Sequence, residues 1–230
     1  LRSALLTSIS HDLRTPLASI LGNVSSLRRL GHLYDDATRA EMLEFTEVET
    51  LRLARFVDNL LHMTRIDAGA LQPTFEMIDL GDVLGSALKR LARTLAQHQV
   101  LVDIETDLKM VPIDFMLMEQ VLANLLDNAA KYAPPGTCIR VSIRSADDCV
   151  ELLVMDEGPG IPHADLHQIF ERFYRVRATD HRPAGAGLGL AICRGFVEAM
   201  GGRIRVANRP DRSGALFTVT LPAVRATVMT

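Results

Sequence analysis

The sequence predicts an α+β protein, in which an antiparallel helical hairpin precedes a two-layer α/β sandwich. Over the first 69 residues, apolar side chains recur at helical spacing, and glycine and proline are scarce. Beyond Pro73, short β-like runs alternate with helical segments, which is typical of a mixed α/β domain. The length of 230 residues suits one large domain or two modest ones. We place the two domains at residues 1–70 and 74–222.

Two apolar stripes make up the predicted hairpin. The first contains Leu5, Ile9, Leu13, Leu17, Leu21 and Val24, and the second contains Met42, Phe45, Val48, Phe56, Leu60 and Met63. Steps of three and four place each set on one side of a helix, and the short break at residues 31–36 favours antiparallel neighbours. A single hairpin leaves its apolar seam half covered. We therefore expect a homodimer through residues 1–70 that completes a four-helix bundle.

The second region alternates between strand and helix patterns. Strands are predicted at Phe75–Ile78, Val100–Glu105, Ile139–Ile143, Val150–Met155, Ile204–Ala207 and Ala215–Leu221, and helices at Leu80–Gln97, Phe115–Tyr132 and Leu188–Met200. The long stretch from Glu157 to Ala186 is rich in Gly and Pro, and we expect only one short helix in it. Connections of that length are typical of functional lids or of disordered segments.

Composition excludes several classes of protein. The chain is 48% hydrophobic and 23% charged, with a net charge of −3, which excludes a disordered tail. Without a basic excess, no nucleic-acid partner is expected. No apolar run is long enough to span a bilayer. Three cysteines without a CxxC pair indicate neither a disulfide framework nor a zinc site. Because the chain begins at Leu1 without Met, we expect a piece of a longer protein.

A histidine with a neighbouring carboxylate lies inside the first helix. His11 lies away from the apolar seam, and Asp12 follows it directly. A neutral imidazole is a nucleophile near pH 7, and the carboxylate could accept its proton. Pro16 removes a helical hydrogen bond close to this turn. The plain alternative is an exposed helical histidine beside a tolerated proline.

Two asparagines and a lysine share a face of the helix predicted at residues 115–132. Asn124 and Asn128 are four residues apart, and Lys131 lies close by. Amide oxygens suit a hydrated Mg²⁺ already bound to phosphates, and lysine supplies a counter-charge. Asparagine is a poor helix former, so two of them suggest a function. A solvated polar face is the alternative.

Two glycine-rich turns follow. Asp156 ends a predicted strand, and Gly158 and Gly160 allow backbone to approach a ligand while the carboxylate accepts a hydrogen bond from an exocyclic amine. Gly185–Leu190 opens a helix, as phosphate-binding turns do, but lacks the Lys-Ser/Thr of a Walker A loop. Between them, Ile169–Arg175 pairs aromatic side chains with arginines that could hinge a lid. Each pattern alone could be plain surface.

Together, these patterns occur in an order that resembles the sensor histidine kinases of two-component systems, over residues 1 to about 222. Residues 10–17 resemble the phosphoacceptor box, and residues 124–132 the N box. Residues 156–161, 170–175 and 185–190 resemble the G1, F and G2 boxes. The amino-acid sequences of residues 5–22 and 187–202 are most similar to those of the Kdp-type potassium-responsive sensor kinases.

The resemblance implies a role for each matching residue. Residues 1–70 would be the dimerisation and histidine phosphotransfer hairpin, and residues 74–222 an ATP-binding domain of the Bergerat type, related to Hsp90. His11 would be phosphorylated, with Asp12 as its base. Asn128 would hold Mg²⁺. The nucleotide would be lined by Asn124, Lys131, Tyr132, Asp156, Gly158, Gly160, Ile161, Arg172, Arg175, Gly185, Gly187, Leu188 and Gly189. Among these, Asp156 would contact the adenine amine, and Arg175 the γ-phosphate.

The implied activity is ATP-dependent autophosphorylation of His11, followed by transfer to an aspartate of a response regulator. Thr15 fits the His-Asp-x-x-Thr arrangement associated with phosphatase activity toward the regulator. Asp12 departs from the commoner Glu but keeps the carboxylate. The resemblance also implies the cytoplasmic portion of a membrane-anchored bacterial sensor, attached through segments upstream of Leu1. The signal, the regulator's identity and phosphorylation within or between subunits stay open.

Two alternatives remain. One is an ATPase of the sister gyrase and Hsp90 groups, which usually carry a catalytic Glu four residues before the metal-binding asparagine. Here that position is Asn124, and an amide cannot take a proton from water. The other is a degenerate nucleotide-binding regulator that acts by dimerisation and docking.

Overall fold

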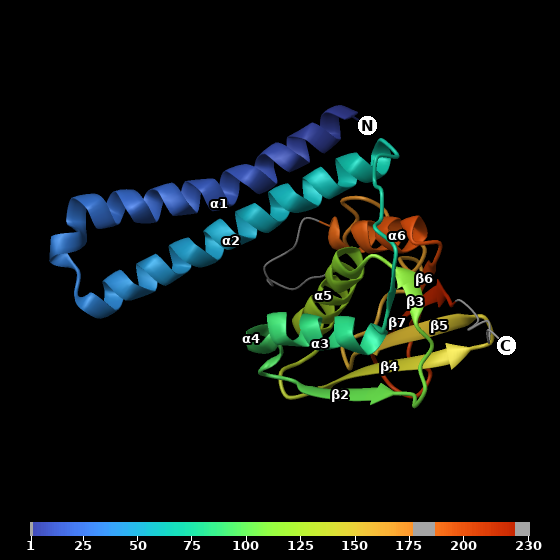
Figure 1. Cartoon of the computed structure of the whole chain (residues 1–230). Helices are drawn as coiled ribbons and strands as arrows, with labels where there is room; N and C mark the ends of the chain where they lie inside the picture. Colours follow the sequence, from blue (N-terminus) through green and yellow to red (C-terminus); the bar gives the residue numbers. More distant parts are fainter. Residues whose placement is uncertain (1, 177–186, 224–230) are drawn as a thin grey trace. The chain divides into compact units, whose positions relative to one another are not determined.

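A computed structural model describes residues 2–176 and 187–223, with side chains described from residue 13 onward. The chain forms two compact units, residues 1–64 and 65–230, which are treated separately. The structure agrees with the predicted class: a helical hairpin followed by a mixed α/β domain (Figure 1). None of the described helices combines the length and apolar character needed to cross a membrane.

The hairpin consists of α1 (Arg2–Leu30) and α2 (Asp36–Asp67), joined by a short 3₁₀ turn at Gly31–Leu33. Asp35 caps α2, because its carboxylate accepts a hydrogen bond from the Thr38 N–H at 2.8 Å. Pro16 lies inside α1 without ending it. The predicted pair of helices and the break between them are confirmed.

The apolar seam of the hairpin is largely uncovered within one chain. Phe56 and Met63 are buried on α2, but Leu21 on α1 is 65% exposed and Val48 on α2 is 52% exposed. Soluble proteins rarely leave a long row of such side chains in water without a partner surface. The seam therefore has the character of an interface.

The second unit contains a five-stranded sheet with the strand order β2-β4-β5-β7-β6. Its strands are β2 (Gln99–Ile104), β4 (Cys138–Ala146), β5 (Cys149–Met155), β6 (Arg203–Asn208) and β7 (Ala215–Pro222). Among the strands that the structure describes in this sheet, β2 and β4 run parallel and the other neighbours antiparallel. A separate two-stranded ladder joins β1 (Glu76–Ile78) to β3 (Val111–Ile113).

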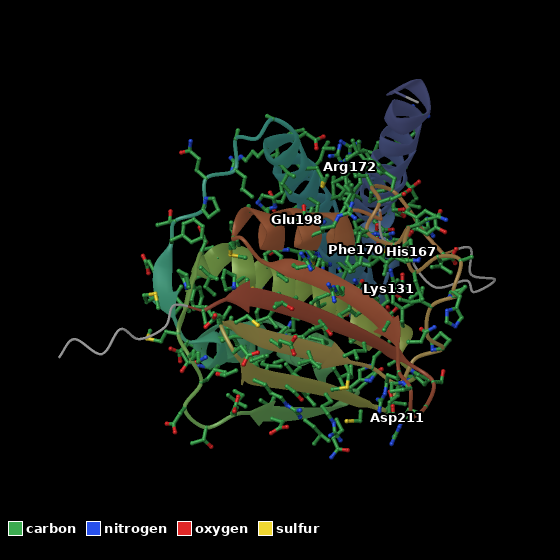
Figure 2. All side chains as sticks on the ribbon, turned by 90° about the vertical axis from the view of Figure 1, so that its right-hand side faces the viewer. Lys131, His167, Phe170, Arg172, Glu198 and Asp211 are labelled. Carbon is green, nitrogen blue, oxygen red and sulfur yellow. The ribbon has the colours of Figure 1, made fainter. Side chains whose placement is uncertain are left out.

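Helices cover one face of the sheet, while Figure 2 looks onto the other face. The helical layer contains α3 (Leu80–Arg90), α4 (Ala92–Leu95), α5 (Phe115–Tyr132) and α6 (Gly189–Ala199) (Figure 1). The core lies between the layers: Leu122, Leu125 and Leu126 of α5 are fully buried, as are Ile139 and Val141 of β4. One face of α5 therefore packs on the sheet, which leaves its asparagine face for the site.

Three details differ from the sequence predictions. The helix predicted over residues 80–97 breaks at Leu91, whose backbone leaves the helical region at φ −98° and ψ 11°. Strand β3 was not predicted, because its three residues carry no alternation and include Pro112. The described part of the long connection, residues 157–176, contains turns but no helix.

Candidate functional site

The site is centred on Asp156, which follows the last residue of β5. The residue is 6% exposed, and its Oδ1 accepts hydrogen bonds from the N–H groups of Gly158 (2.8 Å) and Ala215 (3.1 Å). Burial raises the pKa of Asp156, while the two N–H groups and the charge of Arg209 oppose that rise. Oδ1 thus accepts two hydrogen bonds, and no donor among the described residues bonds to Oδ2, which remains as an acceptor for a ligand.

Glycine is required next to this carboxylate. A Cβ at Gly158 would lie 2.9 Å from Asp156 Oδ1 and 3.1 Å from the Tyr132 carbonyl oxygen. Gly160 has a φ of +78°, and its Cβ would meet Asn208 Oδ1 at 2.9 Å. A side chain at either position would therefore collide with neighbouring atoms. Without one, the backbone of residues 156–161 can approach a ligand closely.

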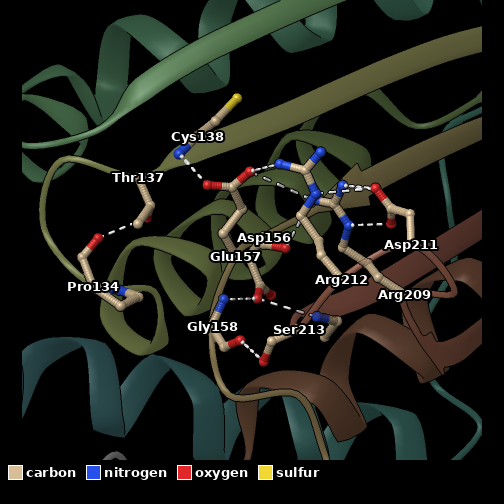
Figure 3. Close-up of polar contacts among 11 residues, drawn as sticks. Pro134, Thr137, Cys138, Asp156, Glu157, Gly158, Arg209, Asp211, Arg212 and Ser213 are labelled. Atoms are coloured by element: carbon tan, nitrogen blue, oxygen red, sulfur yellow. Dashed lines mark hydrogen bonds and ion pairs between the residues drawn. The ribbon is translucent and has the colours of Figure 1, made fainter.

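The loop between β6 and β7 binds this turn (Figure 3). The Arg209 guanidinium donates to the Asp156 carbonyl at 3.2 Å, and Ser213 Oγ donates to the Gly158 carbonyl at 2.7 Å. Glu157 accepts from the Cys138 N–H and pairs with Arg212, which lowers the pKa of its carboxyl. The turn is thus attached to the sheet at several atoms.

Helix α5 supplies the predicted amide face. Asn124 Nδ2 donates to the Gly189 carbonyl at 3.4 Å, and Asn124 Oδ1 accepts from Gln120. Asn128 lies one turn further along and is half-buried. Lys131 sits 5.2 Å above the ring of Tyr132. The structure thereby joins Asn124 to the start of α6, the turn predicted to bind phosphate.

The aromatic segment meets the glycine-rich turn. The Phe173 N–H donates to the Gly187 carbonyl at 2.9 Å. Gly187 has a φ of +69°, and a Cβ there would lie 2.7 Å from the Tyr174 carbonyl oxygen. Leu188 is buried beside them. The two chain segments that flank residues 177–186 are therefore in direct contact.

Several predicted site residues are not brought next to Asp156, or lie outside the part of the chain that the structure describes. Within the second unit, Arg172 pairs with Asp67, whereas Arg175 is exposed. Gly185 lies outside the described residues. The side chains of His11 and Asp12 also lie outside them, although both residues belong to α1. Thr15 is exposed on α1. Among the described residues, no cluster of His, Cys, Asp or Glu could hold a metal ion by itself.

Sequence reasoning missed the residues of the β6–β7 connection. Residues 208–214 were interpreted only as a link between strands, yet Asn208, Arg209 and Ser213 all contact the 156–161 turn. Polar residues in a strand connection carry no periodic signal, because their partners lie some 50 residues away in the chain. Gly214 was the one local hint: its φ is +141°, and a Cβ would meet the Asp156 carbonyl oxygen at 2.1 Å.

Two families match the chain. The His Kinase A (phospho-acceptor) domain matches residues 1–69, and the histidine kinase-, DNA gyrase B- and HSP90-like ATPase family matches residues 113–225. The Sensor protein KdpD of Clostridium acetobutylicum is 39% identical over 224 residues. These residues are 96% of this chain and 25% of that protein, so the chain spans about a quarter of its relative's length.

MprB and AdeS extend the comparison. The histidine-protein kinase/phosphatase MprB of Mycolicibacterium paratuberculosis is 36% identical over 96% of this chain and 43% of that protein. A solved mycobacterial MprB chain is 33% identical with a TM-score of 0.59, and the match covers 65% of this chain and 98% of that one. The Acinetobacter baumannii histidine kinase AdeS has a TM-score of 0.71 at 26% identity, over 93% of this chain and 98% of that one. The chain belongs to the sensor histidine kinase family.

Proposed function

We propose that this chain phosphorylates itself on His11 with ATP and passes the phosphoryl group to an aspartate of a response regulator. Residues 1–70 act as the dimerisation and phosphotransfer hairpin, and residues 74–222 bind ATP. The observation that carries the proposal is the buried residue Asp156, whose Oδ2 accepts from no described residue and lies beside a glycine-rich turn. The same domain holds the asparagine face of α5, which bonds to the start of α6.

The purine end of the site is formed by residues 156–161. Asp156 Oδ2 accepts a hydrogen bond from the adenine amino group, while Gly158, Gly160 and Ile161 bring backbone close to the ring. Because burial excludes water, a ligand that leaves this acceptor unpaired loses substantial affinity. The resulting preference is for a base with an exocyclic donor.

The phosphate end lies along α5 and the start of α6. Backbone N–H groups at Gly187, Leu188 and Gly189 suit phosphate oxygens, since they open a helix. Lys131 and Arg175 add positive charge. Asn128 fits Mg²⁺ through its amide oxygen, because this ion keeps several waters and is held mainly by substrate phosphates with few protein ligands. When bound, Mg²⁺ neutralises phosphate charge.

In the transfer, a ring nitrogen of His11 forms a bond to the γ-phosphorus. The bond from that phosphorus to the bridging oxygen breaks, and ADP leaves with the electron pair. Asp12 accepts the proton of the other ring nitrogen. Phosphoryl transfer depends mainly on positioning and charge neutralisation, and the second step moves the phosphoryl group from nitrogen to a carboxylate oxygen of the regulator.

Asn124 favours transfer to histidine over hydrolysis of ATP. Its amide is occupied by the Gly189 carbonyl and Gln120, and an amide cannot remove a proton from water. A sister-group ATPase needs a base at this place. The kinase therefore remains the favoured function over the ATPase.

The exposed seam supports a homodimer. A second copy would cover side chains such as Leu21 and Val48, which are 65% and 52% exposed in one chain. A molecular mass that stays that of a monomer at all concentrations in sedimentation would exclude the homodimer.

Thr15 supports phosphatase activity toward the regulator, and the similar protein MprB is named a kinase/phosphatase. We further propose that the chain is the cytoplasmic portion of a membrane-anchored bacterial sensor, since the KdpD relatives are about four times longer.

Incubation with [γ-³²P]ATP and Mg²⁺ tests the proposal. A kinase gives protein-bound label that survives alkali and is lost in acid, as expected for a phosphoramidate. Release of inorganic phosphate without protein label would identify the ATPase instead. Nucleotide binding with neither product would identify a degenerate regulator.

A further inference from the structure

We propose that Arg209 is a positioning residue for the nucleotide: its guanidinium holds the Asp156 main chain so that the Asp156 carboxylate faces the purine. The inference rests on the proposed function. It adds a residue from the β6–β7 connection, a segment that lies outside the five boxes described above for this sequence.

The contact of Arg209 with Asp156 is largely shielded from water. The Arg209 side chain is only 10% exposed, and its Nη1 donates to the Asp156 carbonyl oxygen at 3.2 Å. The Asp156 N–H already pairs with the Ala215 carbonyl at 3.1 Å. Arg209 therefore takes the carbonyl of the peptide plane that follows Asp156, at the point where the strand ends and the turn begins.

Arg209 is itself held in place. Its Nε and Nη2 donate to both carboxylate oxygens of Asp211, at 3.0 and 2.7 Å. Its backbone N–H donates to the Gly214 carbonyl at 3.0 Å. A two-point arginine–carboxylate pair restricts the guanidinium plane more than a single contact does. The group that bonds to Asp156 is thus pre-positioned, as Figure 3 shows.

The β6–β7 connection and the start of the 156–161 turn lie so close together that a small shift of one displaces the other. A Cβ at Gly214 would lie 2.1 Å from the Asp156 carbonyl oxygen and 2.9 Å from Arg209 Cδ. If the guanidinium is removed, this carbonyl loses its donor and the peptide plane can rotate. Rotation about the bonds that flank this plane displaces the Cα of Glu157 and with it the next peptide plane, which carries the Gly158 N–H, one of the two donors that orient the carboxylate. The purine acceptor is then misplaced, although the fold remains.

Arg212 provides a matched control in the same loop. Its guanidinium pairs with Glu157 at 2.8 Å and with Asp211 at 3.0 Å, but its side chain is 58% exposed and makes no hydrogen bond to Asp156 within the described part of the chain. Exposed ion pairs contribute little to stability. Both arginines pair with Glu157 and Asp211, so an effect of losing one positive charge beside these carboxylates would appear in both variants, whereas positioning affects only Arg209.

The test compares the whole chain with its Arg209→Ala, Arg209→Lys and Arg212→Ala variants, using calorimetric ATP and GTP binding and autophosphorylation kinetics. For Arg209→Ala we expect ATP affinity to fall about tenfold or more, the ATP-over-GTP preference to shrink, and the rate at saturating ATP to stay within about threefold. Arg209→Lys keeps a donor and a charge, so it should recover part of the affinity. Arg212→Ala should stay within about twofold of the parent.

Other outcomes overturn the inference. These are an Arg209→Ala affinity equal to the parent's, an equal loss in Arg212→Ala, or a fall in rate at saturating ATP without a fall in affinity. If Arg209→Ala does not fold by circular dichroism, Arg209→Lys decides: affinity and purine preference unchanged from the parent would contradict positioning by the arginine fork. Failure of the parent chain to bind ATP would instead contradict the proposed function itself.

Discussion

Asn208 and Ile161 are joined by two reciprocal hydrogen bonds. Asn208 Nδ2 donates to the Ile161 carbonyl and Asn208 Oδ1 accepts from the Ile161 N–H, both at 2.7 Å. The last residue of β6 thereby holds the far end of the 156–161 turn, as Arg209 holds its start. A side chain that both donates and accepts is needed for this pair.

Asn208→Asp keeps the acceptor but removes the donor. We expect the free energy of unfolding to fall by about 1–3 kcal/mol, because the Ile161 carbonyl loses its partner and meets a negative charge. ATP affinity should fall with it. Urea denaturation and calorimetry measure the two effects, and a variant with unchanged stability and affinity would show that the pair does not hold the turn.

Asp156→Asn should change purine preference. The amide oxygen can still accept from the Gly158 and Ala215 N–H groups, but its NH₂ then faces the base. That group opposes the amino group of adenine and matches the carbonyl of guanine. ATP affinity should fall about 100-fold or more while GTP affinity rises relative to it. If the Asp156→Asn variant binds ATP as tightly as the parent does, adenine lies elsewhere.

Gly187→Ala should disrupt the contact between the aromatic segment and α6. The substitution forces a side chain into positive φ and against the backbone of Phe173 and Tyr174. We expect weaker ATP binding and a lower melting temperature. Gly85→Ala is the matched control: Gly85 lies inside α3 with nothing within 4 Å of its Cβ, so stability should rise by about 0.5–1 kcal/mol. Similar behaviour of the two variants in thermal melts would contradict the tight turn.

Cys193 should be unreactive in the folded protein. It is fully buried on α6, and burial raises the pKa of its thiol to about 12. Because the thiolate is the nucleophile, a thiol reagent at pH 8 should modify Cys138 and Cys149 and reach Cys193 only after unfolding. Reaction of all three thiols at one rate in the native state would be inconsistent with this core.

The sequence predicts best where a pattern is local. The bounds of α5 were predicted as Phe115–Tyr132, because Pro134 follows its end and the apolar period runs without interruption. In the structure Asp114 caps its start. Strand β3 was missed, since three residues around Pro112 gain their conformation from pairing with β1 some 35 residues earlier. Tertiary pairing of this kind leaves no local signal.

The same difference between local patterns and tertiary contacts applies to the candidate site. Asp156, Gly158 and the asparagine pair could be proposed in advance because residue type and spacing suffice for them, and their roles stay predictions. Arg172 was expected at the nucleotide, but it pairs with Asp67 in the structure, and its role stays a prediction. The contacts of Asn208 and Arg209 with the 156–161 turn could not be predicted, because their partner atoms come within reach only in the folded sheet.

Autophosphorylation of His11 is the central claim, and label from [γ-³²P]ATP tests it most directly. His11→Gln should incorporate no acid-labile label while it binds ATP as tightly as the parent. His32→Gln, which changes a histidine in the turn between α1 and α2, should be labelled like the parent. Label that persists on His11→Gln, or label lost equally from His32→Gln, would contradict the account.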